Sequence, residues 1–150
     1  MNYWLMKTEP DEFSIDDLKR KKSEPWSGVR NYQARNYMRD GMRKGDGVLF
    51  YHSSCAVPGV AGVAEVATSA HSDPTQFDPR SDYFDAGSGR DAPRWLMVDV
   101  KYKRKLKRVI TLTELKEHGE LDGMILLRPG NRLSVMPVTK AEWDFVLGLE

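Results

Sequence analysis

The sequence predicts one α+β domain with a curved, largely antiparallel sheet and flanking helices. Strand-like segments outnumber helices in the middle of the chain, helix-start signals lie toward both ends, and no βαβ alternation is present. The 150 residues are the usual length of one domain, and no repeat, low-complexity tract or linker divides them. We therefore expect a single domain over residues 1–150, whose curved sheet could close into a small barrel.

The N-terminal segment predicts a strand followed by a helix. Side chains alternate between two faces over residues 3–7, and Pro10 ends this strand. Ser14, with Asp17 three residues later, resembles a capping box. We therefore expect a short helix at 15–22.

The middle of the chain predicts a helix and then the centre of the sheet. A loop that begins at Trp26 leads to a second helix, expected at 31–39. Apolar density and β-branching predict two strands, at 48–53 and 60–67, which we expect to pair antiparallel. The polar stretch at 71–93 is too long to be a mere connection, and loops of this length are usually functional or mobile.

The C-terminal third predicts two strands and two capped helices. One strand, at 95–100, continues into a basic segment, and a final strand is expected at 133–138. Thr111 and Thr139, each followed three residues later by a glutamate, open the helices, and Gly119 should end the first of them. The closing helix packs its apolar residues inward.

Composition excludes several classes of protein. With 40% hydrophobic and 30% charged residues and a mean hydropathy of −0.58, the chain is neither a transmembrane nor a disordered one. Cys55 is the only cysteine and the three histidines lack ligand spacing, so we expect no disulfide and no metal site. The N-terminal apolar run is too short for a signal peptide. We expect a cytoplasmic protein without a cofactor and without a membrane partner.

A net charge of only +1 gives no general attraction to nucleic acid, so such binding must depend on local clusters. One cluster contains Arg30, Arg35, Arg39 and Arg43. The other contains six lysines and arginines within 101–108. A solvated face is the alternative for both, and for the second it is favoured, because lysines on an exposed edge strand guard against aggregation.

The sequence contains no known catalytic motif that would favour an enzyme. Ser53 follows His52, but adjacent residues of a strand point to opposite faces, so the two cannot pair as nucleophile and base. No nucleophile elbow, phosphate loop, zinc motif or dinucleotide fingerprint is present. Lys7 and Glu9 share a face and could act as acid and base, which is a weak signal. An enzyme for a small nucleoside-like or acyl substrate and a protein-interaction module remain the alternatives to a binding domain.

Aromatic residues in loops are more informative. Trp26 lies outside any apolar periodic pattern, just before a segment that contains two arginines, and Tyr83 and Phe84 interrupt an acidic stretch. Covering the core from outside is the alternative for all three. The other three tryptophans fall within periodic strands or a helix and are expected in the core: Trp4, Trp95 and Trp143.

Blocks of residues along nearly the whole chain resemble the EVE domain family. In order they are Trp4 to Pro10, Trp26 to Asn31, Ala34 to Asn36, Gly45 to Asp46, Tyr51 to Ser53, Gly59 to Val66, Pro93 to Trp95 and Arg132 to Val138. The resemblance implies a PUA-like fold, a small β-barrel with flanking helices. This agrees with the α+β fold predicted above.

The resemblance also implies a reader of modified bases. EVE domains are similar to YTH domains, which hold N6-methylated adenine of RNA in an aromatic cage, and related EVE proteins are associated with modified cytosine in DNA. Trp26 then matches the first cage tryptophan, and the strand end at Lys7 to Glu9 lines the base edge. Glu9 replaces the asparagine of the YTH pattern, which argues against methyladenine because an ionised carboxylate only accepts hydrogen bonds. Tyr83 or Phe84 would form the second wall.

We therefore expect a monomeric, non-enzymatic domain that binds DNA or RNA and stacks a modified base, above all a modified cytosine, on Trp26. Arg30 and Arg35 are expected to contact flanking phosphates. The residues expected around the base are Lys7, Thr8, Glu9, Trp26, Gly28, Val29, Asn31, Tyr51, Ser53, Tyr83 and Phe84.

Overall fold

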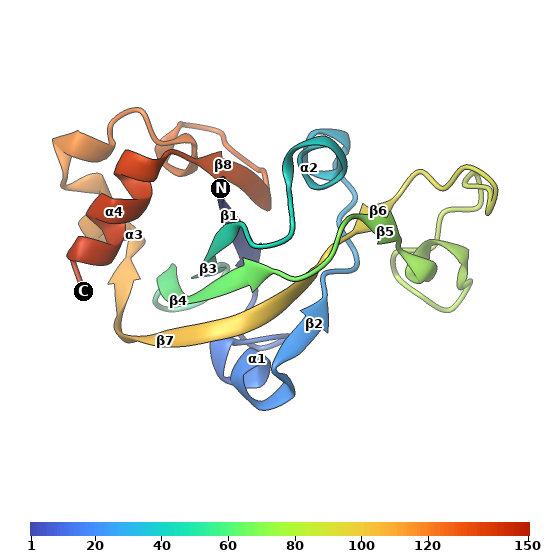
Figure 1. The fold of residues 1–150 in the computed structure, drawn as a ribbon, viewed down its shortest axis with the longest axis horizontal. Coiled ribbons are helices and arrows are strands. Elements are labelled where there is room, and N and C mark those ends of the chain that lie inside the picture. Colours follow the sequence, from blue (N-terminus) through green and yellow to red (C-terminus); the bar gives the residue numbers. More distant parts are fainter.

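The computed structural model describes all residues from Met1 to Glu150, and its body is a six-stranded sheet in the order β2-β7-β4-β3-β1-β8. The strands are β1 (Tyr3–Thr8), β2 (Ser23–Pro25), β3 (Gly47–His52), β4 (Gly59–Val66), β7 (Asp99–Thr111) and β8 (Val135–Val138). The sheet curls into a half-barrel (Figure 1). Pairing is antiparallel except between β1 and β3, which run parallel. The predicted curved, largely antiparallel sheet is therefore confirmed, although its end strands β2 and β8 do not pair, so the barrel stays open on one side.

Four short α-helices flank the sheet: α1 (Ile15–Lys21), α2 (Tyr32–Asn36), α3 (Leu112–Lys116) and α4 (Lys140–Gly148). The capping boxes predicted at Ser14 and Thr139 are both formed in full. At Thr111 only half of the box forms, because the carboxylate of Glu114 binds Arg108 instead of returning to the cap. No helix of the chain has the length and apolar character needed to cross a membrane.

Three local predictions differ from the structure. The predicted helix at 31–39 is split into α2 and a π-helical turn, Tyr37–Gly41. Gly119 does not end α3 but begins a separate 3₁₀ turn. Residues 23–25, for which no strand was predicted, form β2, because they find a partner in 99–101 of β7. Pro25 is tolerated there since it is the last residue of an edge strand.

The core packs on both faces of the sheet. Leu5 and its partner Met136 are fully buried on one face, and Phe50, whose partner is Met6, is fully buried on the other. Trp4 belongs to this core as predicted, and its indole N–H donates to the buried carboxylate of Asp46 at 3.0 Å. Trp143 is only partly buried and packs on Tyr3, with ring centroids 4.7 Å apart.

A lobe, residues 73–95, projects from the half-barrel (Figure 1). A separate two-stranded ribbon, β5 (His71–Ser72) paired with β6 (Leu96–Met97), connects the lobe to the rest of the chain. The fully buried Gln76 organises it, because its side chain donates to the carbonyl of Trp95 at 2.8 Å and accepts from the Ser88 hydroxyl at 2.6 Å. The polar stretch predicted as functional or mobile is thus an ordered substructure built around buried polar groups.

Trp95 belongs to this lobe and not to the main core, which corrects the prediction of a core strand residue. The strand begins only at Leu96. The indole of Trp95 is buried, stacks on Tyr32 with ring centroids 4.8 Å apart, and donates to the carboxylate of Asp85 at 2.8 Å. Trp95 therefore joins the lobe to α2.

Candidate functional site

A pocket of about 540 Å³ opens on the side where the half-barrel does not close. We call it the Trp26 pocket. Its walls come from the end of β1, from β2 and the loop after it, from the turn after β3, from the lobe and from the segment before β8. The lining residues are Lys7, Thr8, Glu9, Glu12, Phe13, Glu24, Pro25, Trp26, Ser27, Gly28, Val29, Arg30, Ser53, Ser54, Tyr83, Arg132, Leu133 and Ser134.

Trp26 lines this pocket but is also a core residue, so the expectation that it lies outside the core is wrong. Only 8% of its surface is exposed. Its indole packs edge-to-face on Phe50, with centroids 5.7 Å apart, and on Phe13, with centroids 6.5 Å apart. The backbone N–H of Trp26 donates to Val98 at 2.9 Å, which turns the loop inward. The indole is therefore rigidly held and presents only a small surface to the pocket.

Phe13 was missed by the sequence analysis although it lines the pocket beside Trp26. One signal could have found it. Phe13 precedes the N-cap Ser14, and Leu18 lies four residues inside the helix, which is the spacing of a hydrophobic staple.

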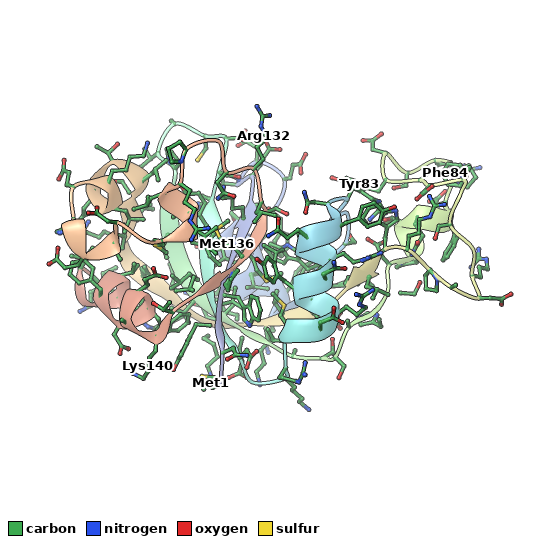
Figure 2. The ribbon with its side chains drawn as sticks, turned by 90° about the horizontal axis from the view of Figure 1, so that it is seen from above. Met1, Tyr83, Phe84, Arg132, Met136 and Lys140 are labelled. Atoms are coloured by element: carbon green, nitrogen blue, oxygen red, sulfur yellow. The ribbon has the colours of Figure 1, made fainter.

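Tyr83 forms the outer aromatic wall, whereas Phe84 does not line the pocket. The ring of Tyr83 lies directly over Gly28, where a Cβ atom would come within 2.8 Å of the ring. Gly28 also has φ +86°, a conformation that favours glycine. Tyr83 is 40% exposed, so it offers more aromatic surface to a ligand than Trp26 does. Phe84 is exposed farther out on the lobe (Figure 2).

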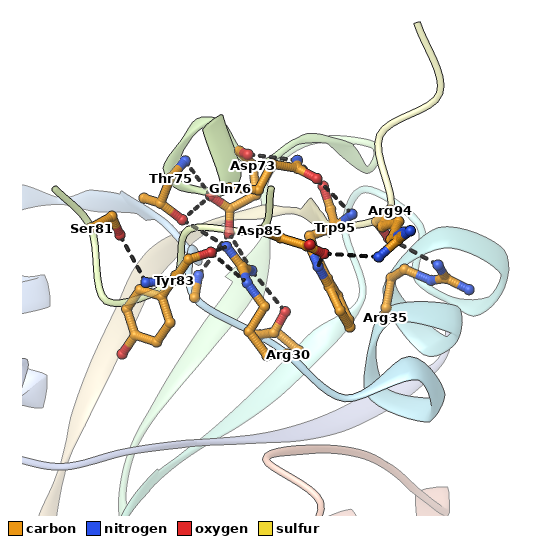
Figure 3. Close-up of polar contacts among 12 residues, drawn as sticks. Arg30, Arg35, Asp73, Thr75, Gln76, Ser81, Tyr83, Asp85, Arg94 and Trp95 are labelled. Atoms are coloured by element: carbon orange, nitrogen blue, oxygen red, sulfur yellow. Dashed lines mark hydrogen bonds and ion pairs between the residues drawn. The ribbon is translucent and has the colours of Figure 1, made fainter. Parts of the chain in front are cut away.

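Arg30 ties the lobe to the pocket loop (Figure 3). Its guanidinium donates to the carbonyl of Tyr83 at 2.7 and 3.0 Å, and to the hydroxyl of Thr75 at 2.9 Å. The remaining N–H groups donate to the carbonyl of Val29 at 3.0 Å and the carboxylate of Asp73 at 3.2 Å. All five donors are thus used within the chain. Arg30 therefore has a structural role in the chain, and its expected phosphate contact stays a prediction.

Asp73, missed by the sequence analysis, is the fully buried centre of this network. Its carboxylate accepts hydrogen bonds from the backbone N–H of Gly28 at 2.7 Å and of Thr75 at 2.8 Å. Burial opposes ionisation of Asp73, but the hydrogen bonds from Thr75, Gly28 and Arg30 outweigh it and lower the pKa. Asp73 therefore fixes the backbone of Gly28 and, through it, the rim under Tyr83.

Three further expected residues do not line the pocket. The Asn31 side chain accepts from the N–H of Ala34 at 3.0 Å and caps α2. Arg35 donates to the carbonyl of Arg94 at 2.9 Å and to Asn36. Tyr51 is buried, and burial raises the pKa of its phenol to about 12. Each side chain is engaged locally, which the sequence pattern did not show.

The polar wall contains four expected residues, Lys7, Thr8, Glu9 and Ser53. Burial lowers the pKa of Lys7, whose ammonium lies 5.8 Å from the ring centroid of Tyr51. The Ser53 N–H donates to the carbonyl of Thr8 at 2.9 Å, and this joins the ends of β1 and β3. Hydrogen-bonding groups of both kinds therefore face the pocket: a carboxylate, an ammonium and hydroxyls.

His52 and Ser53 do not form a catalytic pair, as strand alternation predicted. The His52 Nε2 atom accepts a hydrogen bond from the backbone N–H of Ile15 at 3.1 Å. The Ser53 hydroxyl donates to the carbonyl of Thr8 at 3.5 Å. No group of three or more His, Cys, Asp or Glu side chains is placed to hold a metal ion.

The basic segment at 101–108 lies in β7, with β4 on one side. On the other side β2 pairs only with residues 99–101, so the prediction of an edge strand is confirmed for residues 103–108 and wrong only where β2 covers the start of the segment. Most of its cations pair with acids of other elements. The ion pairs are Lys101 and Lys103 with Glu65, Arg104 with Glu150, Lys105 with Asp16, and Arg108 with Glu114. Four acids thus compensate part of the charge of the six cations, and Lys107 has no ion pair.

Comparison with known proteins places the chain in a family. The EVE domain family model matches residues 2–149. Thymocyte nuclear protein 1 of Homo sapiens is 44% identical over an alignment of 168 positions, gaps included, which covers 99% of this chain and 74% of that protein.

Solved structures agree over the whole chain. A protein of Pseudomonas syringae is 48% identical, with a TM-score of 0.95 and coverage of 98% of both chains. The crystal structure of human THYN1 protein in complex with DNA containing 5-methylcytosine is 43% identical, with a TM-score of 0.94, and covers 99% of this chain and 97% of that chain. These matches confirm the predicted PUA-like α+β fold. The chain belongs to the EVE domain family.

Proposed function

We propose that this chain binds DNA that carries a modified cytosine, and that the extruded base enters the Trp26 pocket without being chemically changed. The observation that carries the proposal is the complex of human THYN1 with DNA containing 5-methylcytosine. That protein shares 43% of its residues with this chain and has a TM-score of 0.94 to it. The pocket described above is the site that we assign to the base.

The size and aromatic walls of the pocket support this assignment. Its volume of about 540 Å³ lies within the range of about 300–1,000 Å³ that is common for small-ligand sites. Stacking on an aromatic side chain contributes about 1–3 kcal/mol per base and is tolerant of base identity. Because Trp26 is almost fully buried, we assign most of this stacking to Tyr83, with Trp26 and Phe13 behind it.

The polar wall supports a cytosine edge. Cytosine presents an exocyclic amine beside a ring nitrogen acceptor, so the Glu9 carboxylate can accept while the Lys7 ammonium donates. Asn31, which caps α2, is not needed as the donor. Glu9 is exposed in the free chain, and a bound base would cover its carboxylate. Thymine would then direct a carbonyl at Glu9 and leave the covered carboxylate without a donor, at a cost of about 1–3 kcal/mol. A buried methyl group alone contributes only about 0.8 kcal/mol, so the polar edge must supply most of the base selectivity.

The cost of extruding a base favours single-stranded targets. Removing a base from a duplex costs a few kcal/mol, and the cost is least where the base is unpaired. We therefore expect tighter binding to a single strand than to the matching duplex.

The engagement of the nearby nucleophile supports binding without turnover. The Ser53 hydroxyl donates to a backbone carbonyl, and the ring nitrogen of His52 is used by the α1 backbone. Prolonged incubation with 5-methyl-2′-deoxycytidine should therefore return the nucleoside unchanged. Formation of any product would favour the enzyme alternative.

The test of the proposed function is competition binding of single-stranded oligonucleotides that differ at one position: 5-methylcytosine, cytosine or thymine. We expect the parent chain to prefer 5-methylcytosine to thymine by at least about fivefold, the lower end of the cost of one unpaired polar group. Glu9→Gln should shrink this preference, because an amide can also donate. The matched control is Glu117→Gln, an exposed glutamate remote from the pocket lining.

Three outcomes contradict the proposal in different ways. Equal preference in parent and Glu9→Gln removes Glu9 from the site. Preference for thymine overturns the proposed orientation of the base. Tighter binding of the RNA version of the oligonucleotide replaces DNA by RNA as the partner.

A further inference from the structure

Both positive and negative side chains line the Trp26 pocket. The cations are Lys7, Arg30 and Arg132, and the anions are Glu9, Glu12 and Glu24. A base that enters the pocket brings its flanking phosphates to the mouth, where they need an exposed cation that is not already used.

Neither arginine selected from the sequence meets this requirement. All five N–H donors of Arg30 are bonded within the chain, and one of its partners is the buried carboxylate of Asp73. Arg35 is not part of the pocket lining, and its guanidinium lies 4.8 Å from the ring of Tyr32. Freeing Arg30 for a phosphate would leave a buried carboxylate without its partner, which is costly.

Arg132 is an exposed cation at the pocket that is not already used. The residue is exposed and lines the pocket, and its side chain takes part in none of the hydrogen bonds or ion pairs of the chain. Figure 2 shows it projecting outward from the segment that leads into β8. Lys7 is the other unpaired cation of the pocket, but it is half-buried deeper in the wall, over the ring of Tyr51.

The backbone that carries Arg132 is held in place although the side chain is free. The N–H of Lys7 donates to the carbonyl of Ser134 at 2.8 Å, which extends the pairing of β1 with β8 toward Arg132. The next residue, Leu133, is buried, and its N–H donates to the side chain of Asn131 at 3.1 Å. The guanidinium is therefore anchored at the rim and can still reach over the mouth.

We propose that Arg132 binds the phosphate adjacent to the base held in the Trp26 pocket, so that the strand crosses the mouth on the side of the segment before β8. This inference rests on the proposed function and deepens it, because it names the phosphate contact and the path of the strand. An arginine fork suits this task, since it can donate two hydrogen bonds to one phosphate.

Two of the three acids of the pocket favour the same path, and the third, Glu9, is assigned to the base edge. Glu12 is exposed and has no cation partner among the ion pairs of the chain, and Glu24 on β2 is paired with Lys21 at 2.5 Å. A phosphate that crossed near Glu12 would meet a like charge, whereas one near Arg132 meets an opposite charge. The phosphate is therefore repelled on a path past Glu12 and attracted on a path past Arg132, which favours the path past Arg132.

The experiment measures the affinity of the full chain for a single-stranded oligonucleotide with one 5-methylcytosine, at salt concentrations from about 50 to about 300 mM. Arg132→Ala should reduce the magnitude of the slope of log affinity against log salt by about 0.7, the value for one phosphate of a single strand. At the lowest salt the affinity should fall roughly three- to tenfold. Binding of the free nucleoside 5-methyl-2′-deoxycytidine should be unchanged, because it carries no phosphate.

The matched control is Arg128→Ala, which removes an exposed arginine of the same loop that does not line the pocket. It should behave like the parent chain, and both variants should melt at the parent temperature. An Arg132→Ala slope equal to that of the parent, or an equal loss in Arg128→Ala, overturns the inference and leaves the proposed function standing. If the parent chain binds neither nucleoside nor oligonucleotide, the proposed function fails and the inference fails with it.

Discussion

Replacing Trp26 by alanine tests the central finding that this pocket residue is also part of the core. The indole is 8% exposed and packs edge-to-face on both Phe13 and Phe50. Truncating a buried tryptophan to alanine costs about 3–5 kcal/mol, because apolar contacts are lost and a cavity remains. The total stability of a domain is about 5–15 kcal/mol. Trp26→Ala should therefore remove a large share of it.

The assay is thermal unfolding followed by circular dichroism or calorimetry. For a chain of this length, 1 kcal/mol corresponds to a shift of about 2–4 °C, so we expect Trp26→Ala to melt about 6–20 °C below the parent. The matched control is Phe84→Ala, which removes an exposed aromatic residue of the lobe and should change stability by less than about 0.5 kcal/mol.

Base binding by the Trp26 variants must be measured well below their melting temperatures. Trp26→Phe keeps an aromatic ring against Phe50 and should retain most of the stability, so it separates the two roles of the residue. Melting of Trp26→Ala within about 2 °C of the parent would refute the reasoning, since it would place the indole on the surface. A well-folded Trp26→Phe with parental base affinity would show that the indole itself contributes little to the ligand contact.

Two further predictions concern the pocket rim at Gly28 and the dependence of stability on pH through His52. Gly28→Ala should lower the free energy of unfolding by about 1–2 kcal/mol for the positive φ, and further because the new Cβ clashes with the ring of Tyr83. Gly45→Ala, where φ is +97° and the Cβ position is open, should show the backbone cost alone. Equal losses of stability in the two melting curves would contradict the contact between Gly28 and Tyr83. Burial lowers the pKa of His52 below its usual value near 6.5, so the neutral ring stabilises the fold above that pH and stability should fall as the pH decreases through it. His52→Gln keeps an acceptor for the N–H of Ile15 without titrating, and denaturant unfolding at about pH 7.5 and about pH 5 should show a smaller loss than in the parent; an equal loss would assign the pH effect to other groups.

Local signals predicted most of the elements, because they act over a few neighbouring residues. The capping boxes at Ser14 and Thr139 satisfy the free N–H groups of the first helical turn wherever the helix is placed. The strands at 48–53 and 60–67 were likewise predicted to within one residue at each end, as β3 and β4, because they combine apolar density with β-branching.

Part of the candidate site could also be predicted from the sequence. The end of β1 with Lys7, Thr8 and Glu9, the loop with Trp26 and Gly28, and Tyr83 of the lobe do line one pocket. The resemblance to the EVE domain family brought these segments together before any geometry was known. Pattern alone did not join Tyr83 to Gly28, which lies 55 positions earlier in the chain.

Only the tertiary structure decided which charges are free. Arg30 and Lys105 look like exposed cations in the sequence, yet Asp73 and Asp16 neutralise them from distant positions. Arg132 begins one of the blocks that resemble the EVE domain family but was not expected at the site, and it is the unpaired cation at the pocket mouth.

The sequence by itself determined the fold class, the helix starts and the strands β1, β3, β4 and β8, because these depend on spacing, capping and side-chain periodicity. The structure decided that Trp26 is buried, that β2 pairs with β7 and that Arg30 ties the lobe to the pocket loop. These outcomes depend on partners such as Phe50, Asp99 and Tyr83, which lie 24 to 74 positions away from the residues that they contact. Hydrogen bonds and packing between such residues form only when the chain has closed on itself, so no local pattern records them.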